Sequence, residues 1–256
     1  MRDLLQRVAD GDISPAAAET QLRGYVTGEA GRFDAARVAR TGIPEGIITD
    51  GKTTAEVAAL ALDAVAATGR ALVTRADDAT TTAVTEAVAD EFPAATIDTN
   101  PRAGTVVVHA SDFERPDLDA SVGVVTAGTS DAGPAGEAAV VAREMGLVVD
   151  RIDDVGVAGI HRLFDALERL REPDVLVVAA GREGALPTVV AGLVDAPVVG
   201  LPVSNGYGHA GAGEAALDGM LQSCTPLSVV NIDAGFVAGA QAGLVARAVA
   251  AGRSEE

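Results

Sequence analysis

The sequence predicts an α/β protein whose C-terminal half is a doubly wound parallel sheet, with a smaller α/β domain before it. Three observations support this fold class. The chain has 256 residues, long enough for one large or two small domains. Hydrophobic residues make up 48% of it, enough to bury a sizeable core. In the second half, short apolar runs rich in Val alternate with helix-like stretches, the order typical of parallel sheets.

The N-terminal elements follow from local signals. Ser14 and Pro15 stand where a helix N-cap and a first helical residue belong. The patterns that follow predict a helix over 54–69 ended by Gly69, a strand over 70–75, a second helix, and a strand over 104–111.

A polar segment over 113–120 contains Pro116 and shows no periodicity, which is typical of a linker. We therefore expect two domains, at 1–115 and 119–256. The second domain is predicted to contain strands over 121–128, 174–181, 196–203 and 227–233, a further apolar segment over 147–164, and helices over 134–145, 159–171, 184–193 and 213–222. Strands that are apolar on both faces belong in a parallel sheet covered by helices, which binds ligands beyond the carboxyl ends of its strands.

Composition excludes several classes of function. The net charge of −18 is spread along the chain, and one lysine, Lys52, stands against eighteen arginines. This balance indicates a surface adapted to high salt and argues against nucleic-acid binding. The sequence lacks an uninterrupted run of about 18 apolar residues, so no membrane span is expected. The first residues lack a signal-peptide pattern, and the single Cys224 cannot form an internal disulfide, so we expect a cytoplasmic protein.

Polar residues and glycines gather in loops next to the predicted strands, and we expect these loops to share one edge of the sheet. Gly128 permits a tight turn before a helix start that favours an anion. The candidate residues are Gly128, Thr129, Ser130, Asp131, His161, Arg162, Gly181, Glu183, Gly184, Ser204 and Asn205, with Cys224 before the last strand and Asn231 and Asp233 after it.

Each candidate also has a purely structural interpretation. The Gly-Thr-Ser-Asp turn is often a helix cap, and Glu183 could simply complement a helix dipole. His161 and Arg162 could be surface residues, and Cys224 could be a small core hydrophobe. The coincidence of five polar loops is more than packing requires, and this favours a site.

The motifs "GTSD", "GIHRLF", "AGREGALPTVVAGL" and "PVVGLPVSNGYG" resemble, in order and spacing, the phosphoribosylaminoimidazole carboxylase (PurE) superfamily. The segments "EGIITDGKT", "DVGVAGIHRL" and "EGALP", and above all "MLQSC" followed by "VVNID", are more similar to the LarB family of nickel-pincer nucleotide cofactor carboxylases. The sequence departs from that pattern at Arg182, where methionine is usual, and at Ala234, where asparagine is usual. The resemblance implies a PurE-like, flavodoxin-like three-layer C-terminal domain.

The resemblance also implies a reaction. Nicotinate adenine dinucleotide would be carboxylated at C5 of its pyridinium ring, and its phosphoanhydride hydrolysed, giving pyridinium-3,5-biscarboxylate mononucleotide and AMP. CO2 or bicarbonate is the expected co-substrate, with no tightly bound organic cofactor. A thiolate of Cys224 that adds at C4 would make C5 nucleophilic enough to attack CO2. His161 or Asp131 is the expected base, with His161 preferred.

Further roles are expected for several residues. Arg162 is a candidate for binding the nicotinate carboxylate or a phosphate, and Lys52 for binding a phosphate. Glu183 or Asp233 is a candidate for holding Mg2+. Ser130, with Asp131, is a candidate ribose or carboxylate contact, and segment 32–47 has the charge density of a flap over a charged substrate. The resemblance implies a homo-oligomer, with an octamer as a candidate size and sites near subunit boundaries. Two alternative functions remain open: an aminoimidazole ribonucleotide carboxylase or mutase, and a nucleotide-binding protein without catalysis.

Overall fold

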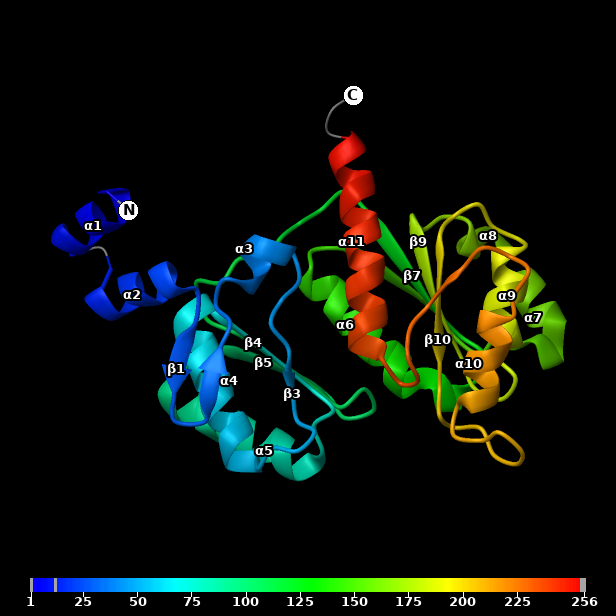
Figure 1. The fold of residues 1–256 in the computed structure, drawn as a ribbon, viewed down its shortest axis with the longest axis horizontal. Coiled ribbons are helices and arrows are strands. Elements are labelled where there is room, and N and C mark those ends of the chain that lie inside the picture. The colour runs from blue at the N-terminus through cyan, green and yellow to red at the C-terminus, as the bar shows by residue number, and fades with distance from the viewer. Residues whose placement is uncertain (1, 12, 254–256) are drawn as a thin grey trace. The chain divides into compact units, whose positions relative to one another are not determined.

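The computed structural model describes residues 2–11 and 13–253, which divide between Glu114 and Arg115 into two compact units. Figure 1 shows the first unit in blue to cyan-green and the second in green to red. Each unit has its own sheet and its own core, so each is described by itself.

The first unit is a four-stranded sheet with helices. Its strands lie in the order β3-β4-β6-β5, with β3 parallel to β4 and the other pairs antiparallel. A hairpin of β1 and β2 stands apart from this sheet. The elements are α1 (Arg2–Ala9), α2 (Pro15–Arg23), β1 (Val26–Gly28), β2 (Gly31–Phe33), α3 (Arg37–Thr41), β3 (Ile47–Ile48), α4 (Thr54–Thr68), β4 (Arg70–Thr74), α5 (Asp78–Glu91), β5 (Thr96–Asn100) and β6 (Thr105–His109).

Helix α4 illustrates how local sequence sets the boundaries. Thr53 and Glu56 form a reciprocal capping box at its start, which satisfies two backbone N–H groups that lack helical partners. Gly69 ends the helix in a left-handed conformation at φ 73°, which glycine adopts without steric cost. The helix predicted over 54–69 and the strand that follows it are therefore confirmed.

The second unit is a five-stranded, all-parallel sheet in the order β11-β10-β9-β7-β8. Its elements are β7 (Ser121–Thr126), a 3-10 turn (Thr129–Asp131), α6 (Ala132–Glu144), β8 (Val148–Ile152), a second 3-10 turn (Val157–Gly159), α7 (Ile160–Asp165), α8 (Leu167–Leu170), β9 (Val175–Ala180), α9 (Ala185–Ala191), β10 (Val198–Pro202), α10 (Glu214–Leu221), β11 (Ser228–Val229) and α11 (Gly235–Arg253). The predicted doubly wound parallel fold is confirmed.

Helices cover both faces of this sheet. Helices α6 and α11 pack together on one face, whereas α9 and α10 pack on the other, where α7 also lies (Figure 1). Residues of β9 and β10 are buried throughout, which explains why these strands are apolar on both sides. The strand order reverses between β7 and β9, so this is the switch point where such sheets bind ligands.

Helix α11 had no counterpart in the sequence analysis. It packs against α6 through glycines: a side chain at Gly239 would lie 2.4 Å from the Ala138 carbonyl oxygen, and one at Gly235 2.3 Å from the Pro134 carbonyl oxygen. Within the described residues, α11 alone has the length and mean hydropathy of a membrane span, but the buried face formed by its small residues lies in the core of the unit. A core helix of a soluble domain meets the same criteria.

Candidate functional site

A pocket opens at the carboxyl ends of β7, β9 and β10, at the switch point of the sheet. Its cavity of about 340 Å³ is within the range of small-molecule sites. Four loops contribute to its wall, and each follows a strand of the parallel sheet. The polar residues in the wall are Ser130, Asp131, Arg162, Arg182, Glu183, Asn205 and Tyr207.

A buried carboxylate joins three of these loops. Asp131 is 2% exposed, and its two oxygens accept hydrogen bonds from the Gly128 backbone N–H at 2.7 Å and from the Asn205 side-chain amide at 2.6 Å. The backbone N–H of Gly181 also points at this carboxylate. Asn205 donates a further hydrogen bond to the Ser130 hydroxyl at 2.8 Å. The sequence prediction that Ser130, Asp131, Gly181 and Asn205 lie together is therefore correct in geometry.

Burial raises the pKa of the Asp131 carboxyl above its ordinary value, although the hydrogen bonds from Asn205 and from backbone N–H groups act in the opposite direction. Removal from water disfavours the charged form, and N–H donors favour it. Because its oxygens are already engaged, Asp131 is suited to holding the loops together. This geometry favours a positioning role over the role of base that was predicted for it.

The glycines of the site differ in what they contribute. A side chain at Gly181 would lie 1.7 Å from the Asn205 amide oxygen, so the close approach of the two loops requires glycine there. Gly184 has φ 65° and faces the Ala216 carbonyl oxygen, so it too must be glycine. Gly128 is extended, at φ −148° and ψ 173°, and a side chain there would have room. The predicted tight turn is present, since the Asp131 backbone N–H donates to the Gly128 carbonyl oxygen at 3.1 Å. It does not require glycine at position 128, where the backbone N–H contacts the Asp131 carboxylate.

Helix α7 carries the pair His161 and Arg162, which the structure separates. Arg162 lines the pocket and forms an ion pair with Asp154 at 2.5 Å. His161 is exposed and lies outside the pocket wall. Successive residues of a helix point about 100° apart, so two neighbours seldom reach one cavity. Of the two residues expected at the site, Arg162 therefore lines the pocket of its own chain and His161 does not.

The remaining loop residues stand around the pocket. Asp233, with φ 54°, accepts a hydrogen bond from the Ser204 backbone N–H at 3.0 Å and so links the loops after β10 and β11. Asn231 is exposed, and its side-chain oxygen accepts from the Ile232 N–H at 2.8 Å. Thr129 belongs to the 3-10 turn between Gly128 and Asp131 without lining the pocket.

The predicted Mg2+ ligands can be tested by geometry. Within residues 2–11 and 13–253, no three His, Cys, Asp or Glu side chains converge as a metal site. Asp233 is engaged by Ser204, whereas Glu183 lies exposed on the pocket wall. Mg2+ is often held by one carboxylate together with substrate phosphates. Glu183 fits such a site and Asp233 does not.

Cys224 is an exposed free thiol, so the core interpretation is wrong. It lies after α10, as predicted, and before β11. Because β11 is parallel to β10, the thiol lies near the amino ends of these strands, whereas the pocket lies at the carboxyl ends. The neighbouring Thr225 hydroxyl donates to the Thr188 carbonyl oxygen in α9. The expectation that all five loops share one edge is therefore wrong for Cys224: one chain does not bring its thiol into its own pocket.

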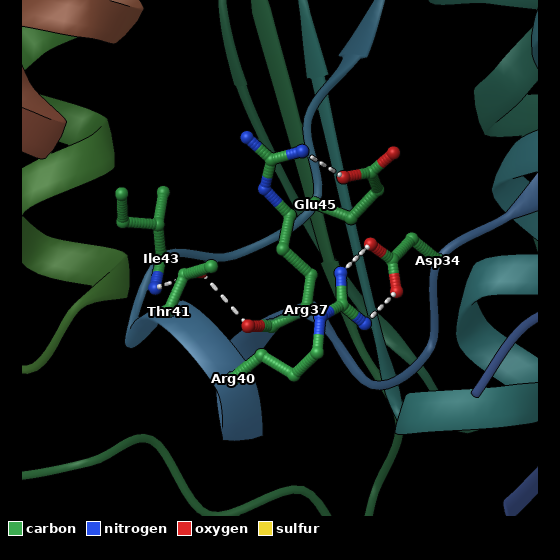
Figure 2. A network of polar contacts seen from close by, with 6 residues as sticks. All are labelled: Asp34, Arg37, Arg40, Thr41, Ile43 and Glu45. Atoms are coloured by element: carbon green, nitrogen blue, oxygen red, sulfur yellow. Dashed lines mark hydrogen bonds and ion pairs between the residues drawn. The ribbon is translucent and has the colours of Figure 1, made fainter.

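Lys52, the expected phosphate ligand, and segment 32–47, the expected flap, lie in the first unit. The Lys52 ammonium donates to the Ile48 carbonyl oxygen at 2.7 Å, so it closes its own loop. In segment 32–47, Figure 2 shows that two arginines bind carboxylates of the same segment: Arg40 pairs with Asp34 through two hydrogen bonds at 2.9 and 2.6 Å, and Arg37 with Glu45 at 2.9 Å. These arginines are compensated inside their own unit.

Two polar residues of the pocket wall were absent from the predicted site. Arg182 was noted as a departure from a family pattern, and Tyr207 was not singled out. Both line the cavity. The signal for Arg182 was its place between Gly181 and Glu183, and the signal for Tyr207 was its place two residues after Asn205.

Two family models match this chain, one in each unit. A family model described as AIR carboxylase matches residues 121–256, and one described as LarB/PurE-like N-terminal domain matches residues 25–110. The uncharacterized protein MJ0165 of Methanocaldococcus jannaschii is 40% identical over 258 residues, which is 96% of this chain and 97% of that protein. The crystal structure of Treponema denticola PurE is 23% identical, covers 50% of this chain and 78% of its own, and has a TM-score of 0.38. The chain therefore belongs to the LarB family within the PurE/AIR carboxylase superfamily, and its domains are those of a carboxylase-type enzyme.

Proposed function

We propose that this protein carboxylates nicotinate adenine dinucleotide at C5 of the pyridinium ring through a cysteinyl adduct and hydrolyses the phosphoanhydride. The products are pyridinium-3,5-biscarboxylate mononucleotide, a precursor of a nickel-pincer cofactor, and AMP. The observation that carries the proposal is an exposed cysteine in an AIR carboxylase unit. We propose that the reaction takes place in the cytoplasm.

The chemistry explains why a thiol is needed. A pyridinium ring is electron-poor and CO2 is an electrophile, so the two do not react directly. When a thiolate adds at C4, its lone pair forms the S–C bond and a ring π pair moves onto the nitrogen, which becomes neutral. C5 is then the nucleophilic end of an enamine. C5 then attacks CO2. Removal of the C5 proton and departure of the thiolate restore the aromatic pyridinium, so the sequence is redox-neutral.

The position of Cys224 implies that two chains form each active site. The pocket and the thiol of one chain lie at opposite edges of the sheet. We therefore propose that the thiol comes from a second copy of the chain in a homo-oligomer, for which an octamer remains the candidate size. Closed assemblies of identical chains repeat such a contact, so each pocket can meet one partner thiol.

Inside the pocket, the side chains suit different tasks. Asn205 and Ser130 present an amide and a hydroxyl beside the buried Asp131, a combination suited to ribose hydroxyls. Arg162, fixed by Asp154, can present further N–H donors to a carboxylate or phosphate. No described residue forms a hydrogen bond or ion pair with the Glu183 carboxylate, so we propose that Glu183, in place of His161 or Asp131, accepts the C5 proton.

The second half of the reaction is the hydrolysis of the phosphoanhydride. Water attacks one phosphorus of the phosphoanhydride, the bridging oxygen leaves with the other phosphate, and a proton is released. Mg2+, when bound with Glu183 as its protein ligand, would neutralise charge on the phosphate oxygens. The pocket residues hold the dinucleotide so that its pyridinium ring and its phosphates keep fixed positions.

The test is direct. The purified protein is incubated with nicotinate adenine dinucleotide and bicarbonate in high salt, and mass spectrometry follows AMP and a mononucleotide that has gained one carboxyl group. We expect both products from the wild type and neither from Cys224→Ser. Carboxylation of aminoimidazole ribonucleotide that survives Cys224→Ser would support the purine reaction, and binding of the dinucleotide without products would support a binding protein.

A further inference from the structure

Arg182 occupies a strained position in the turn after β9. Its φ is 50°, in the left-handed region that side chains other than glycine rarely adopt. Gly181 precedes it and Gly184, which follows Glu183, has φ 65°, so two of the four residues of this turn are glycines. A long charged side chain therefore starts from a backbone that disfavours it, which is a common feature of functional sites.

The aromatic ring of Tyr207 holds the guanidinium of Arg182. The central carbon of the guanidinium lies 3.8 Å from the ring centroid, and one N–H group donates to the Tyr207 hydroxyl at 2.6 Å. Stacking on an aromatic face limits the conformations of an arginine without neutralising its charge. Tyr207 is itself 74% exposed, so it contributes little to a core and is free to serve as a support.

The charge of Arg182 has no carboxylate partner among the described residues. This contrasts with Arg162 in the same pocket, which pairs with Asp154. In a chain of net charge −18, an arginine that lines a cavity without a carboxylate is conspicuous. A guanidinium carries five N–H donors, and Tyr207 uses one of them here.

We propose that Arg182, supported by Tyr207, binds an oxyanion of the substrate in this pocket. The inference rests on the proposed function and deepens it, because the dinucleotide offers two kinds of oxyanion: the carboxylate of its pyridinium ring and its phosphates. Planar guanidinium donors match both groups through paired hydrogen bonds. If the carboxylate is the partner, Arg182 also selects the acid over the corresponding amide.

The experiment measures dissociation constants by calorimetry, without bicarbonate, for nicotinate adenine dinucleotide and for nicotinamide adenine dinucleotide. These ligands share the phosphates and differ in carboxylate against carboxamide. Arg182→Met removes the charge and keeps an unbranched chain. Arg247→Met is the matched control, because Arg247 is exposed on α11 away from the pocket.

We expect Arg182→Met to weaken binding of the nicotinate dinucleotide about tenfold to a hundredfold, the range of a charge-assisted hydrogen-bonded pair. Unchanged binding of the nicotinamide dinucleotide would identify the carboxylate as the partner, and an equal loss for both would identify a phosphate. For Tyr207→Phe we expect a smaller loss of affinity and a raised KM with kcat unchanged, because the ring remains.

The outcomes separate the two proposals. If wild-type protein binds the nicotinate dinucleotide and Arg182→Met binds both ligands as tightly as Arg247→Met does, the role of Arg182 is refuted while the proposed function stands. If the wild type binds neither dinucleotide, the proposed function fails and the inference about Arg182 fails with it.

Discussion

The side-chain amide of Asn205 donates a 2.6 Å hydrogen bond to the carboxylate of Asp131, 74 residues earlier in the chain. This bond ties the loop after β10 to the loop after β7, across the switch point of the sheet. The same amide reaches the Ser130 hydroxyl. The Asn205 amide therefore holds together two of the four loops that form the pocket wall.

Replacing Asn205 with Ala should destabilise the second unit. The buried Asp131 carboxylate would lose a donor, and an under-satisfied buried acceptor costs about 1–3 kcal/mol. Denaturant unfolding at pH 7 measures the change. Asn231→Ala is the matched control, because Asn231 is exposed and, among the described residues, its side chain bonds only the backbone N–H of Ile232; it should change stability by less than about 0.5 kcal/mol. Equal stability of the two variants would refute the role assigned to Asn205.

Asp131 should also give a pH dependence of defined sign. Burial raises the pKa of the folded-state carboxyl above the ordinary value of 3.8, so the folded protein binds more protons than the unfolded chain between the two values. Stability contributed by this group therefore falls as pH rises from about 3.8 through the raised pKa, and is constant above it. We expect the stability of the wild type relative to Asp131→Asn to decrease over that interval. An increase would show that the hydrogen-bond donors outweigh burial.

Cys224 should react slowly with iodoacetamide in the absence of substrate. The thiol is exposed, so access does not limit the reaction, but only the thiolate form is nucleophilic. Its place after the C-terminal end of α10 also disfavours an anion. Mass spectrometry of the alkylated protein should give a rate no higher than that of glutathione. Since the chain has a single cysteine, no second thiol obscures the result. A rate many times higher would show an activated thiolate in the free protein.

Glu183→Gln should abolish carboxylation while leaving dinucleotide binding nearly intact, because the amide can no longer accept the C5 proton. Rates are measured across a Mg2+ titration. Recovery of the wild-type carboxylation rate at high Mg2+ would contradict the role of base and leave Glu183 with its metal role alone. Glu214→Gln is the matched control: it makes the same change at an exposed residue of α10 outside the pocket, and it should keep full activity.

Much of the fold could be predicted because local signals and packing agree. The capping box of α4 marks the start of that helix in the sequence. The strands β7, β9 and β10 are buried, and their apolar residues show this in the sequence. Helix α11 could not be predicted, since its glycines are poor helix formers and its small residues give little apolar periodicity, so the helix is stabilised by packing on α6. Strand β5 was also missed, because most of its residues are exposed.

The site was predictable in part. Loops that follow parallel strands must meet at one edge, so Ser130, Asp131, Gly181 and Asn205 were correctly grouped. The position of Cys224 follows from the same rule, because a residue before a parallel strand lies at the opposite edge. The stacking of Arg182 on Tyr207 depends on how two loops meet in space, so the spacing of the two residues in the sequence could not predict it.

The central claim is that a thiol from one chain serves the pocket of another. Cys224→Ser removes the thiol, and Ala158→Trp fills the pocket from an exposed wall position, so each variant alone should be inactive. The two are co-expressed with different tags, and assemblies that carry both tags are purified and assayed for AMP and the biscarboxylate product. A working site needs an open pocket from a Cys224→Ser chain and a thiol from an Ala158→Trp chain. If the two chains mix at random in equal amounts, about a quarter of the sites meet both conditions, and activity should return to about a quarter of wild type. Mixed assemblies as inactive as their parents, beside an active wild type, would show that thiol and pocket act within one chain and would contradict the account.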